Sequence, residues 1–162
     1  MRQYLEVLKD VFENGQGVKR GEKIRDDRTG VGTTALFDRE MRFDLADGLP
    51  IVTTKKVAFE LVKAELLWFL SGSRDVKELQ KMGGHIWDAN ANAEYWKMKV
   101  EFEGDVGRIY GVQWRKWRRP DGTSLDQLGD VIEKIKNKPH DRRLLVLAWN
   151  PGELEYMCLP PC

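Results

Sequence analysis

Cysteine and histidine are scarce in this sequence, with two residues of each among 162. The pair Cys158 and Cys162 cannot build a disulfide framework or a four-ligand zinc site. His85 and His140 are too far apart in the chain for a familiar metal-ligand spacing. We therefore predict that the protein holds no metal, and that it works in a reducing compartment, the cytoplasm.

Long apolar runs and an excess of one charge are also missing. The longest apolar stretch, residues 66–70, is far too short to cross a bilayer, and the amphipathic N-terminus does not resemble a signal peptide. A net charge of +1 argues against binding of polyanions by bulk charge. The length suits one domain with a single core, which we predict to span residues 1–162.

What is present is a series of helix signals. Apolar residues at helical spacing predict helices over residues 4–12, 57–70 and 73–82, the last of them capped by Ser73, with a further helical piece within 92–98. The sequence Ser124–Gln127 has the form of a capping box, so we expect it to open another helix. Its inward residues would be Leu125, Leu128, Ile132 and Ile135.

Strand signals lie between the predicted helices. Short strands are expected at residues 33–38 and 40–44, after a glycine-rich loop over 15–30, and residues 107–117 are β-prone. The run LLVLAW, residues 144–149, predicts a strand buried on both faces. This order of elements indicates an α+β fold, with helices packed on a sheet.

Glu65 falls within the apolar face of the predicted helix 57–70, on one stripe with Leu61 and Trp68. One interpretation is a carboxylate at the helix edge that reaches solvent or pairs with a cation. The other is a partly buried acid with a raised pKa, suited to proton transfer near neutral pH. The pattern alone leaves both interpretations open.

Two stretches carry groups that can bind phosphate. In DDRTGVGT, residues 26–33, the glycines permit a tight turn and Arg28 offers donors, although such loops are usually only turns. Arg142 and Arg143 directly precede the predicted strand, where adjacent side chains face opposite sides and at most one meets a given ligand. The alternative is a solvated strand entry that pairs with Asp141.

The stretch VQWRKWRRP, residues 112–120, combines cations with tryptophans, as nucleic-acid surfaces do. It equally fits a strand whose tryptophans are buried and whose cations face water. The nearly neutral charge of the remaining chain favours the second interpretation.

The sequence LPPC presents Cys162 behind two prolines, which stiffen the backbone. A nucleophilic cysteine needs cations that stabilise its thiolate, and Arg28, Arg142 and Arg143 could supply them. The alternative is that Cys162 is simply a small buried hydrophobic residue.

Seven motifs, in order and over nearly the whole chain, together resemble one family, thymidylate synthase. They are DRTGVGT, TTKK, ELLWFLSG, IWDAN, GRIYGVQWR, DRRLLVLAWNPGEL and LPPC. The resemblance implies transfer of a one-carbon unit from 5,10-methylenetetrahydrofolate to carbon 5 of dUMP. Reduction of that carbon to a methyl group would then release dTMP and dihydrofolate.

By the same resemblance, Cys162 is the nucleophile that adds to carbon 6 of uracil and so activates carbon 5. Glu65 moves protons through ordered water, and Tyr110 helps to remove the proton from carbon 5. Arg28 grips the dUMP phosphate.

The resemblance also places Trp87, Asn90 and Leu159 on the folate side of the site. Arg142 and Arg143 resemble a pair that reaches the phosphate in the neighbouring subunit. This implies a homodimer whose two sites share residues and whose sheets pack back to back. Residues 1–162 would then form a catalytic domain that is incomplete at its C-terminus.

The sequence departs from the family pattern at Ala58, where many bacterial members have histidine, and at Arg108, which replaces a common proline. Cys158 stands where alanine is common. The closest alternative is a hydroxymethylase of the same superfamily, acting on dUMP or dCMP, in which water replaces hydride in the last step. A different class of function is nucleic-acid binding through Trp114–Arg119, and weak RNA binding is compatible with either enzyme.

Overall fold

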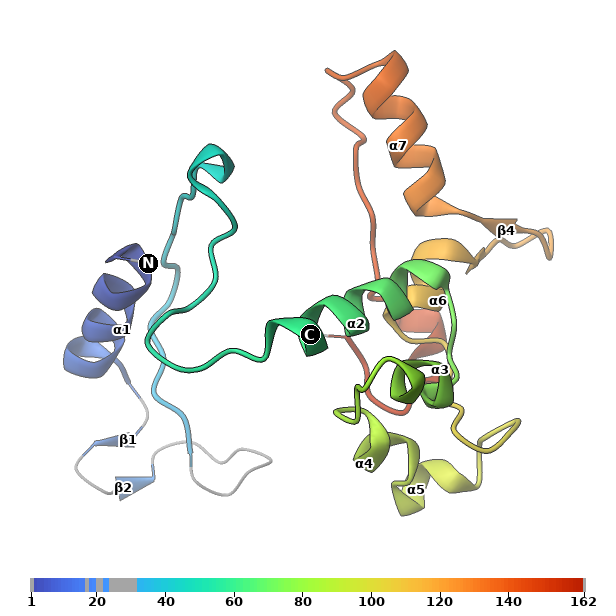
Figure 1. Cartoon of the computed structure of the whole chain (residues 1–162), viewed down its shortest axis with the longest axis horizontal. Helices are drawn as coiled ribbons and strands as arrows, with labels where there is room; N and C mark the ends of the chain where they lie inside the picture. Colours follow the sequence, from blue (N-terminus) through green and yellow to red (C-terminus); the bar gives the residue numbers. More distant parts are fainter. Residues whose placement is uncertain (1, 17, 20–21, 24–31, 162) are drawn as a thin grey trace. The chain divides into compact units, whose positions relative to one another are not determined.

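The computed structural model describes residues 2–16, 18–19, 22–23 and 32–161, which form two compact units that divide after Val57. The first unit contains α1 (Arg2–Asn14), β1 (Val18–Lys19), β2 (Glu22–Lys23) and the 3-10 helix η1 (Leu45–Asp47) (Figure 1). The second unit contains α2 (Phe59–Ser71), α3 (Val76–Lys81), α4 (Asp88–Ala91), α5 (Glu94–Lys97), α6 (Tyr110–Arg115), β3 (Trp117–Arg118), β4 (Ser124–Leu125), α7 (Gln127–Asn137) and the 3-10 helix η2 (Pro151–Tyr156).

The first unit buries little of its apolar surface. Its helix α1 confirms the helix predicted from residues 4–12, yet none of its residues is buried, and Phe12 is 85% exposed. The strands predicted at 33–38 and 40–44 are wrong, since within the described residues these segments make one isolated bridge, between Ala35 and Gln16, and no strand. Within the expected loop, the described residues instead pair as the antiparallel β1–β2 hairpin.

The second unit has its core around α2 and α6, which lie side by side (Figure 1). The predicted helix 57–70 is confirmed as α2, and Gly72 ends it in the left-handed conformation, with φ of 72°. Trp68 is 1% exposed, and its indole N–H donates to the carbonyl of Asp75 at 3.0 Å. The buried core consists of Ala64, Trp68, Phe69, Val76, Leu79, Trp87, Ala91, Trp96, Val106, Ile109, Met157 and Cys158.

The β-prone stretch 107–117 is mostly helical, so that prediction is wrong. It forms α6 and reaches β3 only at its end. The reason lies in packing: a Cβ at Gly111 would stand 2.5 Å from the carbonyl oxygen of Phe69. Because Gly111 lets α6 lie directly on the backbone of α2, tertiary contact outweighs the local preference for a strand.

Two predicted helix caps are also wrong. Asp75, and not Ser73, caps α3 by accepting from the backbone N–H of Lys77 at 2.8 Å. Likewise Asp126 caps α7, while the expected capping residue Ser124 belongs to β4, which pairs with β3. In both cases a carboxylate further along the chain takes the role that a hydroxyl was expected to fill.

The segment 144–149 is not the predicted buried strand. It pairs with no other strand among the described residues, and its side chains alternate between half-buried and exposed. The exposed ones are Leu145 at 64%, Leu147 at 45% and Trp149 at 50%. On α7, Ile132 and Ile135 were expected to face inward, but they are 43% and 52% exposed.

Helices with two small antiparallel sheets agree with the α+β class at this level. The described core is made by helices and loops rather than by a sheet. A larger sheet that packs against that of a second subunit stays a prediction. No helix in the described part of the chain is long and apolar enough to cross a membrane.

Candidate active site

Glu65 lies half-buried on α2 and is fixed by a single strong contact. Its Oε1 accepts a hydrogen bond from the indole N–H of Trp87 at 2.7 Å. Trp87 is 7% exposed and stands at the N-terminal end of α4. The carboxylate is therefore held within the apolar side of the helix and pairs with an indole, rather than with a cation, in that contact.

Phe69, one helical turn after Glu65, joins this pair to Tyr110. Its ring stacks on Tyr110, with centroids 4.9 Å apart and planes inclined by 29°. Trp87 meets both rings edge-on, at 6.0 Å from Phe69 and 6.2 Å from Tyr110. The structure thus joins three predicted site residues: Trp87 and Tyr110 share an aromatic cluster with Phe69, and Glu65 is hydrogen-bonded to Trp87.

Two predicted folate-side residues border the same core. Leu159 is partly buried and packs against the core cluster that contains Trp87. Asn90 is half-buried on α4, three residues after Trp87. Ile86, next to Trp87 in the chain, is 53% exposed, which leaves apolar surface beside the indole.

The segment that leads to LPPC is tied to the residues before α6. Gly107 and Met157 form an antiparallel bridge, and the backbone N–H of Arg108 donates to Tyr156 O at 2.7 Å. Cys158 is 2% exposed, and its burial raises the pKa of its thiol to about 12. Cys158 therefore stays protonated at neutral pH, which makes it a structural residue and a poor nucleophile.

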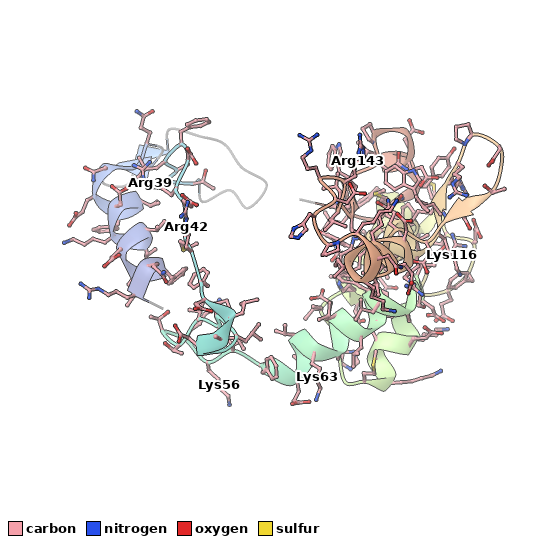
Figure 2. The ribbon with its side chains drawn as sticks, turned by 90° about the horizontal axis from the view of Figure 1, so that it is seen from above. Arg39, Arg42, Lys56, Lys63, Lys116 and Arg143 are labelled. Atoms are coloured by element: carbon pink, nitrogen blue, oxygen red, sulfur yellow. The ribbon has the colours of Figure 1, made fainter. Side chains whose placement is uncertain are left out.

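Arg142 and Arg143 are both exposed, on the segment after α7. Figure 2 labels Arg143. Residues 137–143 line an open hollow of about 550 Å³. The pairing with Asp141 that was the alternative to phosphate binding is present for Arg143, whose backbone N–H also donates to that carboxylate at 2.9 Å. The side chain of Arg143 is 86% exposed and its ion pair with Asp141 is long, at 3.9 Å, so its guanidinium group keeps donors for a further anion.

Two predicted site residues, Arg28 and Cys162, lie outside the described residues. Their assigned roles stay predictions. The family resemblance supports these roles, and no geometry is assigned to either side chain.

The basic tryptophan stretch is largely engaged within the unit. Trp114 packs edge-on against Phe69 and Tyr110, and Trp117 is half-buried in β3. Arg115 pairs with Asp126 at 3.1 Å on the surface. Half-buried tryptophans beside exposed cations agree in part with the interpretation favoured for this stretch, but its tryptophans divide between a helix and a strand.

Sequence reasoning missed a buried polar cluster that contacts α6. Arg108, Gln113 and Glu153 are 9%, 0% and 6% exposed, and both Arg108 and Gln113 donate to the Glu153 carboxylate. A usable signal was the arginine at position 108, because a charge there inside an apolar context requires a buried partner.

Among the described residues, no group of three or more His, Cys, Asp or Glu side chains is arranged to hold a metal ion. In comparison with known proteins, a family model described as Thymidylate synthase matches residues 2–162. The match covers nearly all of the chain, including every residue of the aromatic cluster, Arg142 and Arg143.

Proposed function

Because this chain belongs to the thymidylate synthase family, we propose that it converts dUMP to dTMP with 5,10-methylenetetrahydrofolate as co-substrate. The family is one of one-carbon transfer to a pyrimidine nucleotide, and the proposal specifies methyl transfer to uracil. The observation that carries it is the contact of Glu65 with Trp87 beside Tyr110, with an acid, an indole and a phenol in one cluster.

In this proposal Cys162 is the nucleophile. Its thiolate adds to carbon 6 of uracil, and the electron pair of the 5,6 double bond moves so that carbon 5 becomes an enolate carbon. Carbon 5 can then take up the one-carbon unit. Loss of the proton from carbon 5, aided by Tyr110, allows the bond between the one-carbon unit and the folate nitrogen to break, which leaves a methylene group on carbon 5. Addition of the folate's hydride to this methylene carbon and departure of the thiolate would then give the methyl group and restore the 5,6 double bond.

Glu65 is the proposed proton carrier. The bond from the Trp87 indole fixes Oε1 at 2.7 Å and so orients the carboxyl group. We assign proton transfer to Oε2, through water, towards the oxygen and nitrogen atoms of the uracil ring. A half-buried carboxylate held by one indole keeps a single orientation for this transfer.

Trp87, Asn90 and Leu159 are the proposed folate-side residues. A pteridine ring is flat and apolar on its faces, with amide-like atoms at its edge. Leu159, packed against the core that contains Trp87, and the exposed Ile86 offer apolar surface for the ring faces. The amide of Asn90 can bond to the atoms at the ring edge. When bound, the folate supplies the one-carbon unit and the hydride.

The phosphate of dUMP is assigned to Arg28 of one chain and to Arg142 and Arg143 of the other chain in a homodimer. Support comes from the exposure of Arg142 and Arg143 beside an open hollow. Guanidinium groups bind phosphate through paired hydrogen bonds, which favours arginine over lysine here.

The test incubates the protein with dUMP and 5,10-methylenetetrahydrofolate, follows near-ultraviolet absorbance for dihydrofolate, and measures the mass of the nucleotide product. Dihydrofolate together with a methylated nucleotide is the expected result. A hydroxymethylated nucleotide without an absorbance rise would identify the hydroxymethylase instead. Absence of product from both dUMP and dCMP would refute the proposed enzymatic function and would favour RNA binding by residues 114–119.

A further inference from the structure

Three polar side chains meet around one buried carboxylate in the second unit. We call Arg108, Gln113, Arg118 and Glu153 the Glu153 cluster. Arg108 Nε donates to Glu153 Oε2 at 2.8 Å, and Gln113 Nε2 donates to the same oxygen at 2.7 Å. Arg118 Nη1 lies 3.3 Å from Oε1. The side chains of Arg108 and Glu153 are only 11% and 8% exposed, so this pair is largely removed from water.

Because the Glu153 carboxylate is buried, its hydrogen-bond donors must stay in place. Burial alone would raise the pKa of Glu153, but the hydrogen bonds from Gln113 and Arg108 prevail and lower it below its ordinary value. The carboxylate therefore stays charged at neutral pH. An ionised carboxylate with little access to water must keep its donors, so small shifts of Arg108 or Gln113 are resisted strongly.

The Glu153 cluster holds α6 at both of its ends. Arg108 stands two residues before Tyr110, and its Nη2 donates to the carbonyl of Lys116 at 2.8 Å, just past the helix. Gln113, inside α6, also donates to the carbonyl of Arg108 at 2.8 Å. The orientation of α6, and with it the position of Tyr110, is thus fixed relative to Glu153.

Glu153 itself belongs to η2, which runs directly into the segment that precedes Cys162. The carbonyl of Tyr156, the last residue of η2, accepts from the backbone of Arg108 at 2.7 Å, and the N–H of Cys158 donates to Val106 O at 3.0 Å. Two prolines follow, of which Pro161 is buried. A shift of η2 would be passed along this stiff segment, since its residues have few free backbone torsions.

We infer that Glu153, Arg108 and Gln113 are positioning residues that set Tyr110 and the segment carrying Cys162 at a fixed separation. This inference rests on the proposed function, because it assumes that these two residues act on one substrate. Misplacement of reacting groups by about 1 Å can cost on the order of 100-fold in rate. Arg118 is 59% exposed, and its contact with Glu153 contributes more weakly to the same positioning.

The experiment compares Glu153→Gln with Glu155→Gln in the full chain. Both substitutions remove one carboxylate from η2, but Glu155 is exposed. We expect Glu153→Gln to lower kcat for dUMP about ten- to a hundredfold, with KM changed less than threefold. Glu155→Gln should leave both constants within twofold. If the two variants behave alike, the Glu153 cluster does not position the site.

A second readout does not require turnover. We expect the rate of iodoacetamide alkylation at Cys162 to change at least threefold in Glu153→Gln, while buried Cys158 stays protected and reports an intact fold. An unchanged rate at Cys162 would contradict the inference. Lack of activity in the unsubstituted protein would refute the proposed function, whereas this alkylation measurement would still decide on the coupling.

Should Glu153→Gln fail to fold, Arg118→Met takes its place, because Arg118 is largely exposed and its loss leaves the buried pair intact. The expected result is a smaller fall in kcat, about two- to fivefold, with a matching change in Cys162 alkylation. If both stay at the level of Glu155→Gln, the inference is wrong.

Discussion

Two apolar stretches of the second unit, ELLWFL in α2 and LLVLAW at 144–149, differ in how far the rest of the described chain covers and pairs with them. In α2, Trp68 and Phe69 are buried by α3, α4 and α6. In LLVLAW, every second side chain is exposed and no strand of the described chain pairs with it. A helix satisfies its own backbone hydrogen bonds, whereas an extended segment needs a neighbouring strand.

The residues of the candidate site fall into the same two groups, those on helices and those beside the extended stretch. Glu65, Trp87 and Tyr110 stand on or beside helices and contact one another within one chain. Arg142 and Arg143 precede the extended stretch and are exposed. We therefore expect the proton-transfer half of the site to be complete within a subunit, and the arginine half to act only when a second subunit is present.

The largest expected effect comes from breaking the helical half at its acid. Glu65→Gln should lower kcat by about a hundredfold to ten-thousandfold, because a general acid–base group is lost while its shape is kept. The matched control is Glu60→Gln, an exposed position on the same helix. Near-normal turnover of Glu65→Gln would remove Glu65 from its assigned role.

Leu79 and Leu145 allow the covered and uncovered regions to be compared by the free energy of unfolding. Leu79 is 1% exposed and Leu145 is 64% exposed. Leu79→Ala should lower the free energy of unfolding by about 2–5 kcal/mol, because it leaves a cavity. Leu145→Ala in dilute protein should change it by about 0.5 kcal/mol or less. Denaturant titration measures both, and equal losses would mean that LLVLAW is covered in solution.

A glycine pair tests the contact of α6 with α2. Gly111→Ala places a methyl group 2.5 Å from the Phe69 carbonyl oxygen, so we expect a loss of about 1–3 kcal/mol in unfolding free energy. At Gly152 the nearest atom is 3.6 Å away, and Gly152→Ala should be nearly neutral. Similar thermal midpoints for the two variants would argue against the close approach of these helices.

The smallest effect is the pH dependence due to Glu153. Its pKa is lower in the folded chain than the ordinary 4.5, so its contribution to stability is fully present above that pH. The contribution is lost as pH falls through the folded pKa, at most about 1.4 kcal/mol per pH unit for one proton. Glu153→Gln should flatten this slope below pH 4.5. An unaltered slope would contradict the bonding described for Glu153.

The sequence predicts the helical parts of this structure well, and for a physical reason. Helix α2 and its glycine stop depend on contacts within a few residues, which the spacing of apolar side chains records. The same pattern placed Glu65 on the apolar face. Its contact with Trp87 joins residues 22 positions apart, so no local pattern contains it.

The failures arise where distant contacts decide. α6 was expected to be β-prone, yet Gly111 allows it to pack on α2 as a helix. The LLVLAW segment has the composition of a strand, but composition does not supply the partner that a strand requires. The Glu153 cluster was missed because it unites residues from α6, β3 and η2.

The most direct test of this account is the activity of mixed dimers. Arg142→Ala and Cys162→Ala would each be prepared as an inactive homodimer, mixed in equal amounts and allowed to exchange subunits. With shared sites and random exchange, half of the dimers are hybrids with one intact site, so activity should return to about a quarter of the unsubstituted level. Mass measurement verifies that hybrids form. Hybrids without any dUMP turnover would contradict the claim that the arginines act across the subunit boundary.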